Sequence, residues 1–118
     1  MPKFITSDLK GKELYFDLRA DGAKEPEGFW ATPIFDSDRS KAQQELTATG
    51  KGTQPIWREL LKRHIVRWQG FVDVRGKEIP CTAENIEMLC ESDMSAMMGI
   101  FNILSDAANY GQMLAEKN

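Results

Sequence analysis

The chain has 118 residues, of which 42% are hydrophobic and 28% are charged, and its formal net charge is −3. A chain of this length hides roughly two thirds of its unfolded surface on folding, which allows one domain with a hydrophobic core. These values exclude a disordered chain, and no apolar run approaches the roughly 20 residues of a membrane-spanning helix, so we expect no membrane partner.

A β-hairpin with a long loop is predicted near the N-terminus. Apolar side chains alternate with more polar ones over residues 14–18, the period of two that is typical of a strand with one buried face. A polar loop at residues 20–27 leads into the apolar residues 29–32. The following Pro33 either ends this second strand or places it at a sheet edge, because proline cannot donate a backbone hydrogen bond.

A lightly attached surface helix is expected next. Residues 36–38 offer side-chain oxygens that can cap a helix at residues 39–48. Residues 49–53 contain two glycines and no large apolar group, so they form the clearest break between a β-rich front and a helical back. The few apolar residues of the surface helix are Ala42, Leu46 and Ala48.

A second helix is predicted to face the core. Thr53 is placed to cap it, with Pro55 in its first turn. Its apolar stripe, at spacings of three and four, consists of Ile56, Trp57, Leu60, Leu61, His64 and Ile65. The opposite side holds the nearest approach to a basic cluster, namely Arg58, Lys62, Arg63 and Arg67. These positions fit a solvated helix face and the net charge is negative, so we expect no nucleic-acid partner.

Residues 66–79 have a β-like composition with a turn signal at residues 73–76, which leaves open a second short hairpin between helices. Thr82 resembles the N-cap of a brief helix whose apolar part lies at residues 86–90. A new helical pattern starts after Asp93 and continues to the C-terminal region.

This last helix carries more apolar surface than burial of one side requires. One stripe consists of Met97, Met98, Phe101, Leu104 and Ala108. It is widened beyond a one-sided helix by Ile100, Ile103 and Ala107. Methionines, to which Met88 and Met113 add, either fill a small core or adapt to irregular partners. We predict a protein-binding and self-association surface made of Met94, Met97, Met98, Ile100, Phe101, Ile103 and Leu104.

The predicted architecture is a single α+β domain over residues 1–118, in which the N-terminal β-hairpin packs against a mainly helical C-terminal half. Its parts are a β-rich front with a surface helix at residues 1–48, a flexible break at 49–53 and a helical part at 54–118.

No catalytic site can be assembled from these residues. His64, the only histidine, falls on the apolar side of its helix, where a core or boundary role is expected. Motifs for zinc, phosphate loops and nucleophile elbows are missing. Asp36 and Asp38 are explained as helix caps, and Cys81 and Cys90 as reduced thiols. We therefore predict a non-enzymatic protein with no cofactor and no metal.

A run of turn and cap residues stands out between residues 65 and 89. It comprises a W-x-G segment, an acidic-Gly turn, an [IL]-P pair and a small polar cap followed by E-N, formed by Trp68, Gly70, Asp73, Gly76, Ile79, Pro80, Thr82, Glu84 and Asn85. This order resembles the tail assembly chaperones of long-tailed (siphovirus-type) bacteriophages and prophages. The match covers residues 53–105, and residues 29–34 are similar only in outline.

The resemblance implies a non-catalytic late protein of the host cell cytoplasm that is absent from the mature virion. It would form homo-oligomers, bind the phage tape measure protein, keep it soluble and recruit tail tube subunits during tail morphogenesis. The family commonly makes a longer form by ribosomal frameshifting. An A-rich slippery run can encode Glu116, Lys117 and Asn118, which is compatible with this.

Two other classes of function stay open. A small regulator or inhibitor would bind one fixed protein partner through the same C-terminal helix, and would be a monomer or fixed dimer rather than a concentration-dependent oligomer. An enzyme with an unfamiliar site would depend on His64, so full function after His64→Ala would exclude it.

Overall fold

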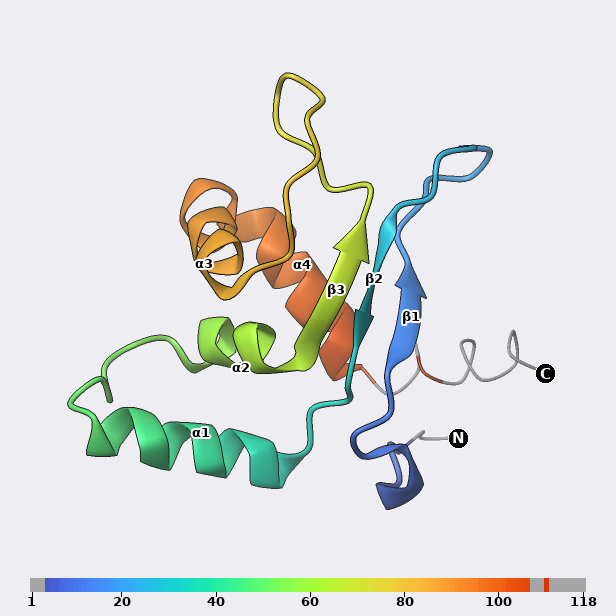
Figure 1. Ribbon diagram of the computed structural model, residues 1–118. Coiled ribbons are helices and arrows are strands. Elements are labelled where there is room, and N and C mark those ends of the chain that lie inside the picture. Colours follow the sequence, from blue (N-terminus) through green and yellow to red (C-terminus); the bar gives the residue numbers. More distant parts are fainter. Residues whose placement is uncertain (1–3, 107–109, 111–118) are drawn as a thin grey trace.

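An antiparallel sheet of three strands forms the centre of the fold (Figure 1). The computed structural model describes residues 4–106 and residue 110. Strands β1 (Leu14–Asp17), β2 (Gly28–Ala31) and β3 (Ile65–Gln69) lie in the order β1-β2-β3. The first two strands confirm the predicted N-terminal hairpin. The third comes from the otherwise helical C-terminal half, so the chain has the predicted α+β fold.

The helices gather on one side of this sheet. They are α1 (Asp36–Ala48), α2 (Ile56–His64), α3 (Ala83–Ser92) and α4 (Met94–Ser105), and a 3₁₀ turn, η1 (Ser7–Leu9), precedes β1. Helix α4 lies across one face of the sheet, while α2 contacts α1 on one side and α3 on the other (Figure 1). The sheet and α4 thus form two layers, and α2 leads directly into β3.

One face of the sheet points into the core. Phe16, Phe29 and Trp68 pair across the three strands, and the rings of Phe16 and Phe29 stack with centroids 5.0 Å apart. Phe29 on the central strand is fully buried. The period of two in β1 therefore has the predicted cause, which is burial of alternate side chains.

The opposite face carries a second row across the strands. Tyr15 pairs with Trp30, which pairs with Arg67. The two aromatic ring centroids lie 4.6 Å apart, and the guanidinium carbon of Arg67 lies 4.4 Å from the Trp30 ring. Trp30 is half-buried on this outer face rather than in the core, because it follows Phe29 by one residue.

A bulge in β3 lets two of its apolar residues face the same way. Ile65 and Trp68 are both buried although they stand three positions apart, whereas a regular strand would point them to opposite faces. The pairing shifts at Val66, because Ala31 pairs with Ile65 while Trp30 pairs with Arg67. Val66 is the unpaired extra residue and is exposed.

Side-chain caps set the start of three helices. The hydroxyl of Thr82 accepts the Asn85 backbone N–H at 3.1 Å, which confirms this predicted cap. The Asp93 carboxylate accepts the Ala96 backbone N–H at 3.2 Å, at the point where the sequence predicted a new helix to start. Helix α1 begins at Asp36 rather than residue 39. Its cap comes from within the first turn, where Asp38 accepts the backbone N–H of the preceding residue 35 at 2.8 Å.

The predicted limits of the second helix are wrong at both ends. Helix α2 begins at Ile56, and Pro55, not Thr53, occupies the N-cap position without a side-chain hydrogen bond. Proline is tolerated at the start of a helix, because its ring fixes φ and a backbone N–H at that position would have no partner within the helix. At the other end Ile65 has a ψ of 121° and belongs to β3, because strand pairing with β2 takes over from the helix.

The second hairpin left open by the sequence is reduced to one bridge, between Val72 and Glu78. The Asp73 N–H donates to the Lys77 carbonyl at 2.8 Å, which closes the turn. Residues 65–69 pair with the central strand β2 instead of with residues 77–80. The sequence signal for β structure was therefore correct at β3, but its partner is distant in the chain.

The core draws on the sheet and on α2, α3 and α4. Its buried members include Leu14, Phe16, Phe29, Leu60, Leu61, Ile65, Trp68, Ile86, Met97 and Leu104. Helix α1 buries only Ala42 and Leu46, so the prediction of a lightly attached surface helix is confirmed. Tyr110 caps this core, because its ring meets Phe16 edge-on and its hydroxyl donates to the Leu104 carbonyl.

The close approach of β3 to the hairpin loop requires a glycine at position 70. Gly70 has a φ of +78°, and a Cβ there would lie 2.4 Å from the Pro26 carbonyl oxygen.

Gly70→Ala should therefore lower the free energy of unfolding by about 2–4 kcal/mol, from backbone strain and the clash together. Gly76→Ala is the matched control, because Gly76 has a similar φ of +85° but open space around it. It should cost only about 1 kcal/mol in urea denaturation; equal losses would contradict the proposed close approach.

Candidate functional site

Helix α4 presents its apolar residues in three stripes. The central stripe is buried in the core, where Met97, Ile100 and Leu104 are 2%, 7% and 0% exposed. Ser95 and Asn102, on the opposite side, are exposed. The predicted seven-residue binding surface is thus divided, because its three central members pack mainly in the core while Met94, Met98, Phe101 and Ile103 lie on two flanks.

The first flank of α4 consists of Met94, Met98 and Phe101, which we call the methionine flank. Met94 is 57% exposed, and Met98 and Phe101 are half-buried. The Phe101 ring lies 6.4 Å from the ring of Trp57 on α2, and the guanidinium carbon of Arg39 lies 5.8 Å from the Phe101 ring. Apolar surface therefore continues from α4 toward α2 on this side.

The second flank of α4 forms one wall of a groove, which we call the α4 groove. Its volume is about 460 Å³, and Leu89 of α3 also lines it. Its wall on α4 consists of Ala96, Met97, Gly99, Ile100 and Ile103, of which Met97 and Ile100 show only a small exposed edge. The facing wall comes from the chain that follows β3 and from the end of the hairpin, and consists of Leu18, Gly70, Phe71, Val72 and Ile79. Such a concave, mainly apolar site matches the usual form of a ligand or partner site.

Trp68 holds the facing wall in place. Its indole N–H donates to the Ile79 carbonyl at 2.7 Å, and its ring stacks on Phe71 with centroids 4.6 Å apart. The Ile79 N–H in turn donates to the Phe71 carbonyl at 2.8 Å. These contacts close the base of the loop at residues 70–80, so that Phe71, Val72 and Ile79 line the groove, while Val74 at the turn is exposed.

Two acidic residues stand at the α4 groove. Glu27 belongs to the hairpin loop and Asp93 to the junction of α3 and α4, and both line the groove. Its lining residues include no lysine, arginine or histidine. The site therefore combines apolar walls with negative charge.

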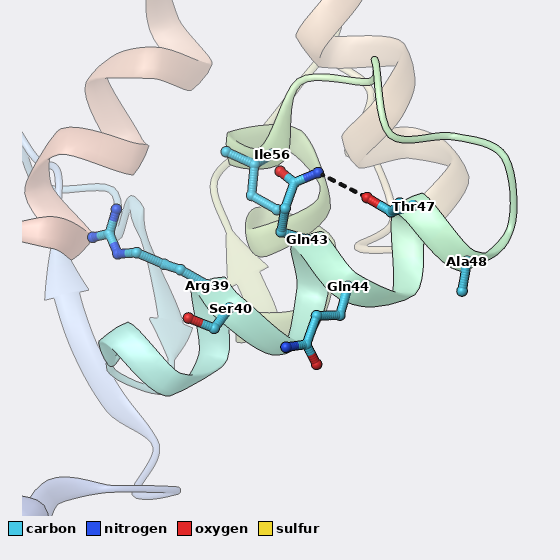
Figure 2. Close-up of a pocket in the computed structure, with 7 residues that line it drawn as sticks. All are labelled: Arg39, Ser40, Gln43, Gln44, Thr47, Ala48 and Ile56. Atoms are coloured by element: carbon cyan, nitrogen blue, oxygen red, sulfur yellow. Dashed lines mark hydrogen bonds between the residues drawn. The ribbon is translucent and has the colours of Figure 1, made fainter.

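A second hollow, of about 680 Å³, lies on the surface of α1 (Figure 2). Gln43 donates to the Thr47 hydroxyl one turn further along α1 at 3.4 Å (Figure 2). The lining consists of Arg39, Ser40, Gln43, Gln44, Thr47, Ala48 and Ile56. It combines one guanidinium with amide, hydroxyl and alkyl groups and includes no carboxylate.

The predicted basic face of α2 is neutralised by ion pairs. Lys62 and Glu87 are 2.9 Å apart, and the pKa of Glu87 is held below its ordinary value chiefly by this hydrogen bond. Arg58 pairs with Glu91 at 2.6 Å, and Arg63 pairs with Glu45 at 2.6 Å. These pairs join α1, α2 and α3. Arg67 lies apart from them on β3, so the four residues do not form one basic surface.

His64 joins β2, α1 and α2 at a half-polar site. It is 8% exposed, and its Nδ1 lies 3.1 Å from the Thr32 carbonyl oxygen. The same Nδ1 lies 3.0 Å from the Thr32 hydroxyl oxygen, so Thr32 contacts this nitrogen through both its backbone and its side chain. Nε2 lies 4.0 Å from the Asp38 carboxylate. Burial lowers the pKa of His64, and the attraction of Asp38 only partly opposes this effect.

Other candidate chemistry is limited in the described part of the chain. Cys81 and Cys90 are free thiols, and burial raises the pKa of both. Residues 4–106 and 110 hold no group of three metal-ligating side chains. None of the helices in this part is long and apolar enough to cross a membrane.

Sequence patterns found the methionine flank and, through Met97, Ile100 and Ile103, part of the α4 side of the groove, but they missed its facing wall. The walls at Phe71, Val72 and Ile79 come from an irregular loop, where no periodicity marks the direction of a side chain. The one available signal was Gly99, a glycine inside an otherwise strongly apolar helix. Ala107, Ala108, Met113 and residues 116–118 lie outside the described residues.

Comparisons of the chain with protein-family models, with curated proteins and with solved structures find no match. The resemblance to tail assembly chaperones therefore stays a prediction.

The buried His64 should make the fold sensitive to mild acid. Its pKa lies below the ordinary value of 6.5 in the folded chain, so the unfolded chain binds more protons below about pH 6.5. The contribution of neutral His64 is complete above that pH and is lost as pH falls toward the lowered pKa.

Urea denaturation between pH 7.5 and pH 5 should show this loss, and His64→Gln should reduce the slope of stability against pH across this range. Arg75→Gln is the control, because Arg75 is exposed and is not among the groups that shift the His64 pKa; it should leave the slope unchanged. An unchanged slope in His64→Gln would show that other groups cause the acid sensitivity.

Proposed function

We propose that the protein is a non-catalytic tail assembly chaperone of a long-tailed bacteriophage or prophage. In this role it binds the tape measure protein, keeps it soluble and recruits tail tube subunits in the host cytoplasm. The order of residues from Trp68 to Asn85 supports the family. The surface of α4 supports the mode of action, because a chaperone for an apolar client needs accessible apolar side chains.

The observation that carries the proposal is the methionine flank. Met94 and Met98 keep unbranched, adaptable side chains at the surface of a helix whose central stripe already fills the core. Core packing therefore explains Met97 but not Met94 or Met98. Continuity with Trp57 and Phe101 gives this surface a rigid aromatic part beside the flexible methionines.

Self-association follows from the same surface. An exposed apolar patch is covered either by a client or by another copy of the chain when no client is present. The regulator with one fixed partner predicts a monomer or fixed dimer instead. The dependence of oligomer size on concentration thus separates the two functions.

Met94→Asp together with Met98→Asp should weaken self-association at least about tenfold, because each change replaces apolar contact with a desolvated charge. Light scattering over a range of concentrations measures this effect. The same variant should leave more tape measure protein insoluble when the two proteins are coexpressed from their own phage or prophage sequence. Asp at position 94 lies in the first turn of α4, where negative charge is favourable, so folding should be preserved.

The matched control is Ser95→Asp together with Asn102→Asp, which adds the same charge on the exposed side of α4. It should behave as the wild type in both assays. If both double variants had the same effect, or neither had any, the methionine flank would not be the client surface. A coding region without a neighbouring tape measure gene would count against the phage role itself.

A further inference from the structure

The packing of the fold does not explain why the α4 groove is open. Its walls are apolar, yet Val72 is 53% exposed at its edge. On the α4 side, a Cβ placed on Gly99 would meet nothing within 4 Å. Glycine lowers the stability of a helix interior relative to alanine, and here no close contact requires it. The helix thus gives up stability at a position that keeps the groove open.

The charges at the groove restrict what can enter it. Glu27 and Asp93 are its two ionisable lining residues, and both are acidic. An apolar ligand with an anionic head, such as a fatty acid, would be repelled, as would a phosphate chain. An apolar protein segment with a lysine or arginine beside it satisfies both the walls and the carboxylates.

We propose that the α4 groove binds a short apolar segment of a partner protein that carries a lysine or arginine next to its apolar residues. The apolar side chains lie between Ile103 on α4 and Phe71 on the facing wall. The basic residue lies at Glu27, the more available of the two carboxylates, because Asp93 also caps α4. The proposal rests on the proposed function only in taking the partner to be an apolar protein segment. The α4 groove lies on the other side of α4 from the methionine flank, so the two sites can be tested separately.

Gly99→Trp tests the walls. The new side chain projects from α4 into the groove, where the space is open, so the fold should be kept, as far-UV circular dichroism would verify. The probe is a fluorescein-labelled synthetic amphipathic peptide of leucine and lysine, and fluorescence polarisation measures its binding to the full chain. Gly99→Trp should weaken binding at least tenfold, and Asn102→Trp, which adds the same ring on the exposed side of α4, should leave it unchanged.

Glu27→Lys tests the charge. The wild type should bind the leucine–lysine peptide at least tenfold more tightly than a leucine–glutamate peptide of the same pattern, and Glu27→Lys should reduce or reverse this preference. Glu13→Lys is the matched control, because Glu13 is exposed, lies at the other end of β1 and gives the same change in net charge. If both substitutions had an equal effect, the overall charge of the protein would explain the peptide preference, and the assignment of Glu27 would be overturned.

Several results would overturn the groove proposal. These are wild-type affinity in Gly99→Trp, no peptide binding by the wild type, and tighter binding of dodecanoate than of the peptide. A change in the oligomer of Gly99→Trp without a change in peptide binding would make the groove a contact between copies. If the groove variant fails while Met94→Asp with Met98→Asp behaves as expected, the chaperone role stands without the groove. If Gly99→Trp behaves as expected while Met94→Asp with Met98→Asp has no effect, the groove proposal stands and the chaperone role does not.

Discussion

The pairing of β2 with β3 is the constraint on which the rest of the structure depends. It places a strand from the helical half beside the N-terminal hairpin and makes β2 the central strand, with Phe29 fully buried. The pairing continues past the strands, because the Thr32 N–H donates to the His64 carbonyl at 3.0 Å. Buried backbone groups at the start of β3 are therefore satisfied by the front of the chain. Without this partner, β3 would be an isolated strand beside α2.

The bulge at Val66 links the pairing of β2 with β3 to the α4 groove. By adding one residue, it turns Trp68 to the same face as Ile65. Trp68 then has its ring in the core and its N–H directed to the Ile79 carbonyl, which fixes the loop that walls the α4 groove. An aromatic residue with one polar group can join a core to a surface loop in this way, because each part of the side chain finds its own environment.

Helix α4 serves the core and the surface at once. Its central stripe is buried under the sheet, so the core fixes the position of the helix backbone that carries both flanks. The flanks differ in character, one being flexible and methionine-rich, the other concave and acidic. His64, which alone could have carried acid–base chemistry as a histidine, is bound to Thr32 at the junction of three elements.

Local signals in the sequence determined the hairpin, the cap at Thr82, the start of a helix after Asp93 and the excess apolar surface of α4, because alternation, capping and helical spacing depend on near neighbours. They did not determine the limits of α2 or the partner of β3, since Ile65 fits a helix stripe as well as a strand and only β2 decides between them. The division of α4 into a buried stripe and two flanks also required the tertiary structure. A helical pattern shows how wide an apolar surface is, but the sheet decides which part of it is covered. The groove depends on an irregular loop held by the Trp68 indole hydrogen bond, the stacking of Trp68 on Phe71 and one backbone bond, contacts that no helical or strand periodicity encodes.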